Sequence, residues 1–297
     1  MQKQDKIQQR IAIASGKGGT GKTTIAVNLA RILENRGVAL LDCDVEEPNA
    51  HLFLQPDFTW ERPVSTFIPQ VDETRCTACG KCSHLCQYNA IVTIKDKVLV
   101  FPELCHACKG CKLICPESAI TDAKKEIGIV AGGHAGSITF VHGKLRIGEA
   151  MSPPLIREVQ RVGLQNKEAE IILIDAPPGT TCPVIQAVRD SDLVILVTEP
   201  TPFGLHDLKL AVEMVRVLGT PFGLVINRST IGNRDVWKFC EAEGIAILQE
   251  IPDDRRIAEA YSRGELIVDA LPRYRETFQR LWEKAMEHLG QAAEDAA

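Results

Sequence analysis

Two identical combs of cysteines occupy a short stretch of this chain, and they constrain its fold more than any other feature. Each comb repeats the pattern C-x2-C-x2-C-x3-C, a spacing that lets one short loop surround a cubic iron-sulfur cluster while its fourth cysteine reaches toward a second cluster. Zinc sites and disulfides are the alternatives, but zinc sites usually pair C-x2-C elements instead of repeating three cysteines. The combs are Cys76, Cys79, Cys82 and Cys86, then Cys105, Cys108, Cys111 and Cys115.

The composition and charge of the chain exclude several classes of protein. Its 297 residues, 45% hydrophobic and 25% charged, can bury one large core and carry a small second domain. The net charge of -5 argues against nucleic acid as a partner. No apolar run approaches the roughly 20 residues that span a bilayer, and the polar opening MQKQDKIQQR lacks the apolar segment of a signal peptide. We expect a cytoplasmic protein without stable membrane insertion.

A glycine-rich loop follows the first apolar segment and precedes a helix expected over residues 23–36. Its glycines permit backbone dihedrals that turn successive N–H groups toward phosphate oxygens at the positive end of that helix. Lys22 would bridge the β- and γ-phosphates of a nucleotide, and Thr23 would bind magnesium through its hydroxyl. The nucleotide-binding candidates in this loop are Gly16, Gly18, Gly19, Thr20, Gly21, Lys22, Thr23 and Thr24.

Near-continuous apolar segments recur along the chain at helix-length intervals. Alternation of such buried strands with helices indicates an α/β protein with a mostly parallel, doubly wound sheet. Ligands of these sheets collect at the carboxyl ends of the strands, where Asp42, Asp175 and Asn227 fall. The expected strands cover residues 10–14, 38–42, 171–175, 193–198, 222–227 and 245–248.

The cysteine-rich segment interrupts this alternation. We place the first part of the α/β domain at residues 1–64, a small α+β insertion at 65–126, and the second part at 127–297. So short an insertion can scarcely fold on an apolar core alone, so bound clusters would supply its framework. Beyond it, a hairpin is expected to turn at His142-Gly143, between two apolar stretches.

The phosphate loop has a second lysine, Lys17, and resembles the loop of the deviant-Walker ATPases. This is the ParA/MinD class, which also includes the Mrp-type cluster carriers and the nitrogenase iron protein. The resemblance implies a P-loop ATPase fold, ATP and Mg2+ as ligands, and a dimer around ATP, formed by identical chains or with a similar ATPase. It also implies that Lys17 crosses to the partner subunit's nucleotide and stabilises the transition state as an arginine finger does. A merely solvated lysine is the alternative.

Further residues match the ParA/MinD class in the expected order. Asp42 and Asp44 resemble the segment whose second aspartate positions the attacking water, and Asp175 resembles the Walker-B aspartate near magnesium. The resemblance also implies contacts to adenine in two later loops. The candidates are therefore Lys17, Lys22, Asp42 and Asp44 for catalysis, and Asp175, Asn227, Arg228, Pro252 and Asp253 for nucleotide binding, the last four on the adenine side.

The resemblance narrows to MinD-superfamily ATPases with an inserted bacterial-type ferredoxin domain, and it covers nearly the whole chain. That family's ligation pattern implies two 4Fe-4S clusters, each held by three cysteines of one comb and the last cysteine of the other. Gln87 stands where the first comb would usually have proline, a departure that removes no ligand. The implied sets are Cys76, Cys79, Cys82 and Cys115 for the first cluster, and Cys105, Cys108, Cys111 and Cys86 for the second.

Three cysteines lie outside the combs. Cys43 and Cys240 are interpreted as core residues. Cys182 is interpreted as a small buried thiol, although the nitrogenase iron protein carries a cluster-bridging cysteine at about that place. None of the three is expected to bind the clusters of the combs.

The C-terminal segment is amphipathic, with apolar residues at helical spacing. MinD uses a C-terminal amphipathic helix to reach membranes, but residues 290–297 lack the basic face that attracts anionic lipid. We expect the helix to pack on the rest of the ATPase. Its apolar positions are Phe278, Leu281, Trp282, Met286 and Leu289.

Two functions fit these motifs. The first is an ATPase whose nucleotide-driven dimer rearrangement is coupled to electron transfer, or to assembly or reduction of a metal centre, in a redox or metallocluster partner protein. The alternative is a ParA/MinD-like positioning or cell-division switch in which the clusters sense redox state or hold the insertion together. A third reading, a ferredoxin with a degenerate ATP site, is opposed by the intact Lys22, Asp44 and Asp175.

Overall fold

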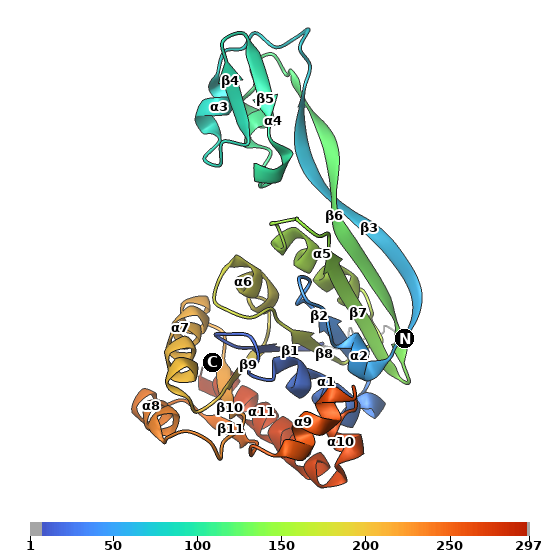
Figure 1. Ribbon diagram of the computed structural model, residues 1–297, viewed down its shortest axis with the longest axis vertical. Coiled ribbons are helices and arrows are strands. Elements are labelled where there is room, and N and C mark those ends of the chain that lie inside the picture. Colours follow the sequence, from blue (N-terminus) through green and yellow to red (C-terminus); the bar gives the residue numbers. More distant parts are fainter. Residues whose placement is uncertain (1–7, 296–297) are drawn as a thin grey trace.

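The computed structural model describes residues 8–295, and a long twisted sheet runs through it (Figure 1). The opening segment, where we expect no signal peptide, falls mostly on residues 1–7, outside the described part. The strands of the sheet are β1 (Gln9–Ala14), β2 (Val38–Asp42), β3 (Asp57–Val71), β6 (Ile120–Ala135), β7 (Ile138–Leu145), β8 (Ile171–Asp175), β9 (Leu193–Thr198), β10 (Phe222–Ile226) and β11 (Ile247–Glu250). They lie in the order β11-β10-β9-β1-β8-β2-β7-β6-β3.

The strands from β11 to β7 in that order all pair in parallel. This confirms the mostly parallel sheet, and each expected strand is present within two residues of its expected bounds. Alternate side chains point to opposite faces, so Ile11 and Ile13 enter one apolar cluster while Ala12 and Ala14 enter the other. Burial on both faces explains why these strands read as continuous apolar runs.

Helices cover both faces of the sheet. Side chains of α1, α10 and α11 pack on one face, and those of α5, α6, α7 and α8 pack on the other. The helices are α1 (Lys22–Ile32), α2 (His51–Leu54), α5 (Pro153–Gly163), α6 (Cys182–Val188), α7 (Pro202–Leu218), α8 (Asp235–Glu243), α9 (Arg255–Ser262), α10 (Ile267–Ala270) and α11 (Arg275–Asp295), with 3-10 turns η1 (Glu34–Arg36) and η3 (Pro272–Tyr274).

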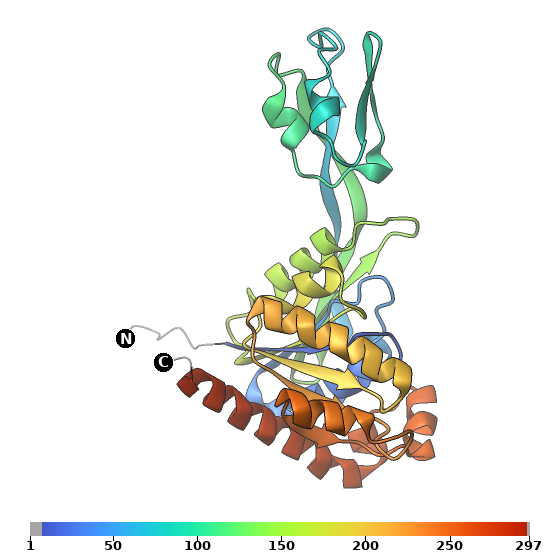
Figure 2. The same cartoon turned by 90° about the vertical axis from the view of Figure 1, so that its left-hand side faces the viewer.

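The last helix, α11, runs along the outside of the sheet (red in Figure 2). Phe278 and Leu281 are 0% exposed, and Trp282 is 5% exposed. The expected packing of this helix is therefore confirmed. Among residues 8–295, no helix combines the length and the apolar character needed to cross a bilayer.

The predicted hairpin at His142-Gly143 is wrong. Strand β7 continues through both residues, which pair with β6, and His142 also pairs with Asp42 of β2. The chain turns earlier, between Ala135 and Ile138, where Gly136 has a φ of 60° that favours glycine. An apolar segment with a central His-Gly pair is thus a single strand beside β2.

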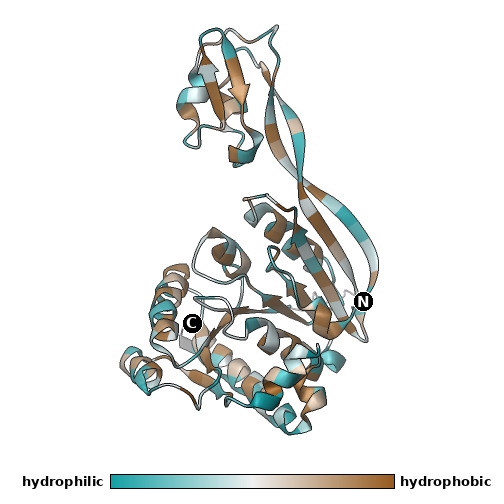
Figure 3. Cartoon of the chain, viewed as in Figure 1, coloured by the Kyte–Doolittle hydropathy of each residue, from teal (hydrophilic) through white to brown (hydrophobic). Residues whose placement is uncertain are grey.

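Strands β3 and β6 pair along their whole length, from Asp57–His134 to Val71–Ile120, and extend well beyond β7. Pairing of β6 with β7 ends at Gly128. The residue before it, the buried Ile127, has no partner on β3 and forms a bulge between the pairs Val64–Gly128 and Ser65–Glu126. Residues 65–71 and 120–126 then continue as a two-stranded ribbon, here called the arm. Figure 3 shows hydrophilic and hydrophobic residues intermixed along this ribbon.

The arm carries residues 72–119, here called the insert, away from the rest of the described chain, here called the sheet core (Figures 1 and 2). The expected boundaries after residues 64 and 126 fall inside β3 and β6, which continue across them. The insert has few fully buried apolar side chains, chiefly Cys82 and Ile91 packed with Ile120. Its elements are α3 (Lys81–Leu85), β4 (Ile91–Ile94), β5 (Lys97–Val100), η2 (Pro102–Leu104) and α4 (Gly110–Ile114).

Candidate functional site

The glycine-rich loop lies between the carboxyl end of β1 and the start of α1. Gly21 caps α1 with a φ of 98° and offers no side chain to the helix, so the first N–H groups are free to meet an anion. Gly16 packs against α7, where an added Cβ would lie 2.1 Å from the carbonyl oxygen of Asp207. The loop therefore has the local structure that a phosphate cradle requires.

One ammonium group and three carboxylates gather behind this loop. Lys22 is 6% exposed, and Asp42 and Asp175 are fully buried neighbours on the paired strands β2 and β8. Burial lowers the pKa of Lys22, although Asp175 and Asp44 raise it. Burial also raises the pKa of Asp44 to about 6 and that of Asp175 to about 7, although Lys22 lowers both. With more acidic than basic groups, the site favours a cation.

Asp175 fits a magnesium site. Both of its carboxylate oxygens are buried and have no hydrogen-bond partner among the described residues. A buried, unpartnered carboxylate is costly unless a cation or a donor meets it. The Thr23 hydroxyl lies close enough to lower the pKa of Asp175. Among the effects on this pKa it is second in size to burial, which raises the pKa. Because Mg2+ prefers oxygen ligands, Asp175 and Thr23 could hold it beside nucleotide phosphates.

Asp42 holds a loop in place. Its Oδ2 accepts from the backbone amides of Asn49 at 3.1 Å and Ala50 at 3.0 Å, and its Oδ1 accepts from that of Asp44 at 3.2 Å. Burial, and next the charge of Asp175, raises the pKa of Asp42 well above its usual range. These contacts favour a positioning role for Asp42, which leaves the less buried Asp44 as the candidate that faces substrate.

Lys17 contacts a carboxylate that the sequence analysis missed. Its Nζ lies 4.0 Å from Oε2 of Glu199, whose side chain is 10% exposed. Arg228 Nη1 lies 3.2 Å from Oε1 of the same residue. Glu199 therefore links the second lysine of the phosphate loop to the expected adenine side. The one signal in the sequence was its place just after the buried strand β9, close to the carboxyl end of the strand, where Asp175 ends β8.

The residues expected to contact adenine lie beside the phosphate loop. Asn227 Nδ2 donates to the carbonyl oxygen of Thr20 at 2.8 Å and so joins the end of β10 to that loop. Arg228 Nε lies 3.7 Å from Oδ1 of Asp253. Pro252 precedes Asp253 in the segment between β11 and α9. The structure thus brings the expected phosphate and adenine segments together.

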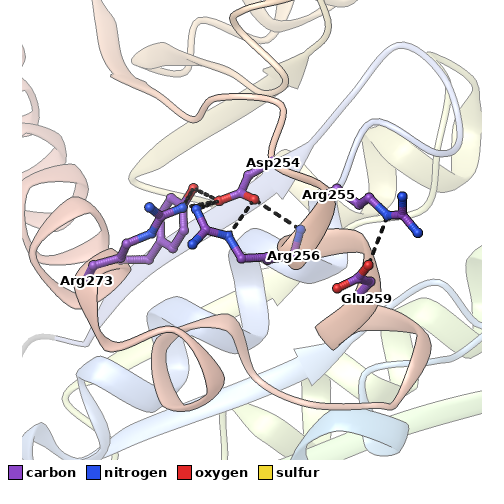
Figure 4. Close-up of polar contacts among 6 residues, drawn as sticks. Asp254, Arg255, Arg256, Glu259 and Arg273 are labelled. Atoms are coloured by element: carbon purple, nitrogen blue, oxygen red, sulfur yellow. Dashed lines mark hydrogen bonds and ion pairs between the residues drawn. The ribbon is translucent and has the colours of Figure 1, made fainter.

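Asp254 anchors the segment that was expected to contact adenine (Figure 4). Its Oδ1 accepts from the Arg256 amide at 3.0 Å and from Arg256 Nε at 3.0 Å, and its Oδ2 accepts from the Tyr274 hydroxyl at 2.8 Å and from Arg273. These donors, Arg256 first, hold the pKa of Asp254 well below its usual range. Asp254 also caps α9, which fixes the end of the segment that carries Asp253.

The eight comb cysteines line two separate cavities of the insert. Among residues 8–295, no three histidine, cysteine or carboxylate side chains meet closely enough to hold a single ion, so the thiols border cavities instead of converging on one point. The resemblance to ferredoxins implies this same division. The first cavity is lined by Cys76, Cys79, Cys82 and Cys115; the second is lined by Cys86, Cys105, Cys108 and Cys111.

Three of the eight comb sulfurs already receive backbone hydrogen bonds. Such donors stabilise the negative charge of metal-bound thiolates. Burial raises the pKa of the free Cys111 thiol to about 11, so a metal would have to displace a tightly held proton there. The amides of Ala90, Ala107 and Ala119 donate to the sulfurs of Cys86, Cys105 and Cys115 at 3.3, 3.4 and 3.3 Å.

Of the three cysteines outside the combs, two are buried as the sequence analysis expected and one is not. Cys43 and Cys240 are buried, as expected. Cys182 is exposed, so its interpretation as a buried thiol is wrong. It is the first residue of α6 and follows the exposed Thr181, which begins the helix at the protein surface.

A family model for the CobQ/CobB/MinD/ParA nucleotide binding domain matches residues 11–267. The chain is similar to two uncharacterized proteins of Methanocaldococcus jannaschii. One is 34% identical over 86% of this chain and 90% of its own length, and the other is 33% identical over 95% and 98%. It is also similar to the iron-sulfur cluster carrier protein of Pyrococcus furiosus, with 26% identity over 90% of this chain and 81% of that protein.

Two solved structures share the fold. The septum site-determining protein MinD of Pyrococcus horikoshii, complexed with Mg-ADP, has a TM-score of 0.60 and 22% identity, and the match covers 96% of this chain and 99% of that one. The cell division ATPase MinD of Pyrococcus furiosus has a TM-score of 0.58 and 21% identity, with 95% and 99% covered.

Proposed function

This chain belongs to the CobQ/CobB/MinD/ParA nucleotide-binding family, and from that premise we propose that it is a magnesium-dependent ATPase that carries two 4Fe-4S clusters. Its nucleotide cycle would be coupled to electron transfer, or to assembly or reduction of a metal centre, in a partner protein. One observation carries the proposal: the comb cysteines line two cavities, four thiols each, at the end of an arm that starts beside the nucleotide site.

In the proposed ATPase cycle, the amides of the phosphate loop and Lys22 hold the β- and γ-phosphates. Asp175 and Thr23 hold magnesium, for which the unpartnered oxygens of Asp175 are suited. Asp44 orients the attacking water, and a pKa raised by burial to about 6 keeps it able to accept a hydrogen bond or a proton near neutral pH. Asp42 keeps Asp44 in place through the loop amides.

The ATP-bound state is proposed to be a dimer, of two identical chains or with a similar ATPase. In the single chain, Lys17 rests near Glu199 and keeps 30% of its side chain exposed. A rotation of this long side chain away from Glu199 would let it reach a nucleotide on the partner subunit. The positive charge would then stabilise the phosphoryl transition state.

Residues 65–126 are proposed to form a two-cluster ferredoxin domain. Cys76, Cys79, Cys82 and Cys115 would hold one cluster, and the remaining four comb cysteines the other. When bound, the clusters supply one-electron transfer. The chain contributes backbone amides aimed at three of the sulfurs, and it encloses the sites in a small apolar shell. The iron-sulfur carrier names of several relatives support this assignment.

A positioning or cell-division switch is the second candidate, and the likeness in fold to MinD favours it. The position of α11 opposes it. Phe278 and Leu281 are fully buried against the sheet, so the apolar face of this helix is not available to lipid.

Chemical analysis and kinetics test the proposal. Anaerobically reconstituted protein should hold about eight irons and hydrolyse ATP with magnesium. Lys17→Ala should keep nucleotide binding but lose roughly 1,000-fold or more in turnover, while Lys167→Ala, at an exposed lysine, should change neither. One zinc per comb would refute the cluster assignment. Turnover unchanged by Lys17→Ala would refute the role in the partner's site. A cluster potential insensitive to ATP would favour the positioning switch.

A further inference from the structure

The two cysteine cavities lie at different distances from the sheet core. The cavity of Cys86, Cys105, Cys108 and Cys111 is bordered by Phe67 and Pro69 of the arm, whereas the other cavity is bordered by Val71 and Ile120, the last pair of the arm. Because Phe67 comes earlier on the outgoing strand than Val71, the cavity that it borders is the nearer one. We call it the proximal cluster site.

Lys125 of the arm contacts both the insert and the sheet core. Its Nζ lies 2.8 Å from Oε2 of Glu149, in the loop between β7 and α5. The same Nζ lies 3.5 Å from the carbonyl oxygen of Pro102, at the outer limit of a hydrogen bond. Pro102 begins the η2 turn, which ends next to Cys105 of the proximal cluster site. One ammonium group thus bridges a cysteine turn and a loop of the sheet core.

Glu149 is a firm point of attachment. Its side chain is 4% exposed, against 22% for Lys125. Its Oε1 also accepts from the backbone amide of Met151 at 3.1 Å. A carboxylate this buried is costly without its cation, so Lys125 and Glu149 are strongly biased to stay together. Lys124, the next residue along the strand, is exposed and makes no such contact among the described residues.

The loop that carries Glu149 is attached to the aspartate segment of the nucleotide site. The amide of Leu145, at the end of β7, donates to the carbonyl oxygen of Val45 at 2.8 Å. Val45 directly follows Asp44 in the chain. The amide of Arg146 donates to the carbonyl oxygen of Ile127, at the base of the arm, at 2.8 Å. Movement of the Asp44 segment would therefore pull on the β7–α5 loop and on the base of the arm together.

We propose that Lys125 is a positioning residue that ties the proximal cluster site to the Asp44 segment through Glu149. The inference rests on the proposed function and names the contact through which the nucleotide site acts on one of the two cluster sites. Lys125 acts in two ways. It holds the turn before Cys105, and its positive charge favours the reduced, more negative state of the proximal site. The other cluster site has no comparable contact with the sheet core among the described residues.

Hydrogen–deuterium exchange on the full chain, reconstituted with clusters, tests the contact. Lys125→Gln should speed amide exchange in residues 101–105 and in residues 146–151, because both segments lose a shared partner. Lys124→Gln, the matched control, should speed neither. If Lys125→Gln leaves exchange in both segments unchanged, the bridge does not hold them and the inference fails.

Redox titration of reconstituted protein tests whether the positive charge of Lys125 favours reduction of the proximal cluster. Electron paramagnetic resonance follows the titration and separates the signals of the two clusters. Lys125→Gln should lower the equilibrium constant for reduction of the proximal cluster about tenfold, which is about 59 mV for one electron. The other cluster should keep its potential. Equal shifts at both clusters, or a shift with Lys124→Gln, would overturn the assignment of Lys125 to the proximal site.

A nucleotide comparison tests the link to Asp44. Any difference in proximal potential between the ATP and ADP states should shrink severalfold in Lys125→Gln and be kept in Lys125→Arg, which retains a cationic donor for both Glu149 and the Pro102 carbonyl oxygen. If the difference persists in Lys125→Gln while exchange is altered, the link to the nucleotide site is wrong. Failure of the proposed function looks different: the wild-type chain would then lack the clusters or the hydrolysis, whatever the state of Lys125.

Discussion

The sheet core and the insert belong to one chain but are stabilised by different means. In the sheet core, two large apolar clusters flank the strands, and side chains such as Phe140 and Phe278 are 0% exposed. In the insert, buried apolar packing centres on Cys82, Ile91 and Ile120, while large apolar side chains such as Leu113, 84% exposed, lie at its surface. The sheet core can therefore fold on apolar burial alone, whereas the insert needs another source of order.

The difference also separates two kinds of site. The nucleotide site lies at strand ends that are fixed by the sheet, so its geometry is present before any ligand binds. The proposed cluster sites lie in a segment with little buried apolar packing, where four cysteines line each cavity, so we expect metal binding and folding of that segment to be coupled. Three experiments can break or sharpen this comparison.

The largest expected effect is the response to iron removal. Reconstituted protein and protein freed of iron by a chelator should differ in residues 72–119, which should lose nearly all protection from hydrogen exchange without iron. The sheet core should keep its thermal transition within about 2 °C, because its apolar clusters are untouched. Cys115→Ser with Cys86→Ser offers the same comparison without chelator. Full protection of the iron-free insert would show that it folds on its own.

A smaller effect should follow acidification, and only in the sheet core. His142 is 8% exposed and stacks on Phe58 at 5.0 Å; burial, then His51 and Lys144, lowers the pKa of His142 from 6.5 to about 4. At His142 the unfolded chain binds a proton more readily than the folded chain, so the contribution of this residue to stability, full above pH 6.5, is lost as the pH falls to about 4. The raised pKa values of Asp44 and Asp175 act with the opposite sign over the same range, so the contribution of His142, about 3 kcal/mol, is measured by urea unfolding as the difference between the wild-type chain and a His142 variant at each pH.

His142→Gln should become more stable relative to the wild-type chain as the pH falls from 6.5 to about 4, because it removes the contribution of His142 from the pH dependence. His134→Gln, at an exposed position on the neighbouring strand β6, should leave it unchanged. If the two chains differ in stability by the same amount at pH 6.5 and at pH 4, the prediction for His142 is wrong. If the insert unfolds in parallel with the sheet core in the wild-type protein, the two regions are more strongly coupled than their packing indicates.

The smallest effect concerns the β6–β7 turn. Gly136 has a φ of 60°, and no atom lies within 4 Å of the position that a Cβ would take. Gly136→Ala should therefore cost only the backbone strain, about 1 kcal/mol in the free energy of unfolding of the sheet core. Iron content should not change. A cost above about 3 kcal/mol, or loss of iron, would mean that this distant turn controls the arm and the insert.

The sequence was sufficient to predict the sheet and the phosphate loop because both have strong local signals. Buried parallel strands such as β2 and β8 are continuous apolar runs, and the glycine pattern before α1 has few other uses. The division of comb cysteines into two sets, implied by the resemblance to ferredoxins, has a counterpart in the two cavities and stays a prediction about ligation.

Other features depend on contacts between distant segments, which no local pattern reports. The run Gly132-Gly133 suggests a loop, yet it lies inside β6, because a Cβ at Gly132 would fall 2.2 Å from the Trp60 ring and one at Gly133 would fall 1.9 Å from the Asp57 carbonyl oxygen. These glycines allow β3 to lie close. Glu199 likewise follows β9 without any motif, and only the fold brings it to Lys17.

The two ends of the insert are adjacent. Val71 pairs with Ile120, and the amide of Asp72 donates to the carbonyl oxygen of Ala119 at 2.8 Å, so the cysteine-rich segment replaces what would otherwise be the tip of a long hairpin. A two-residue turn could close the same ribbon. Acquisition or loss of the insert would then require a single genetic event at one loop, without disturbing the nucleotide-binding domain. The same property makes this hairpin tip a practical graft point for exchanging the insert for another small module.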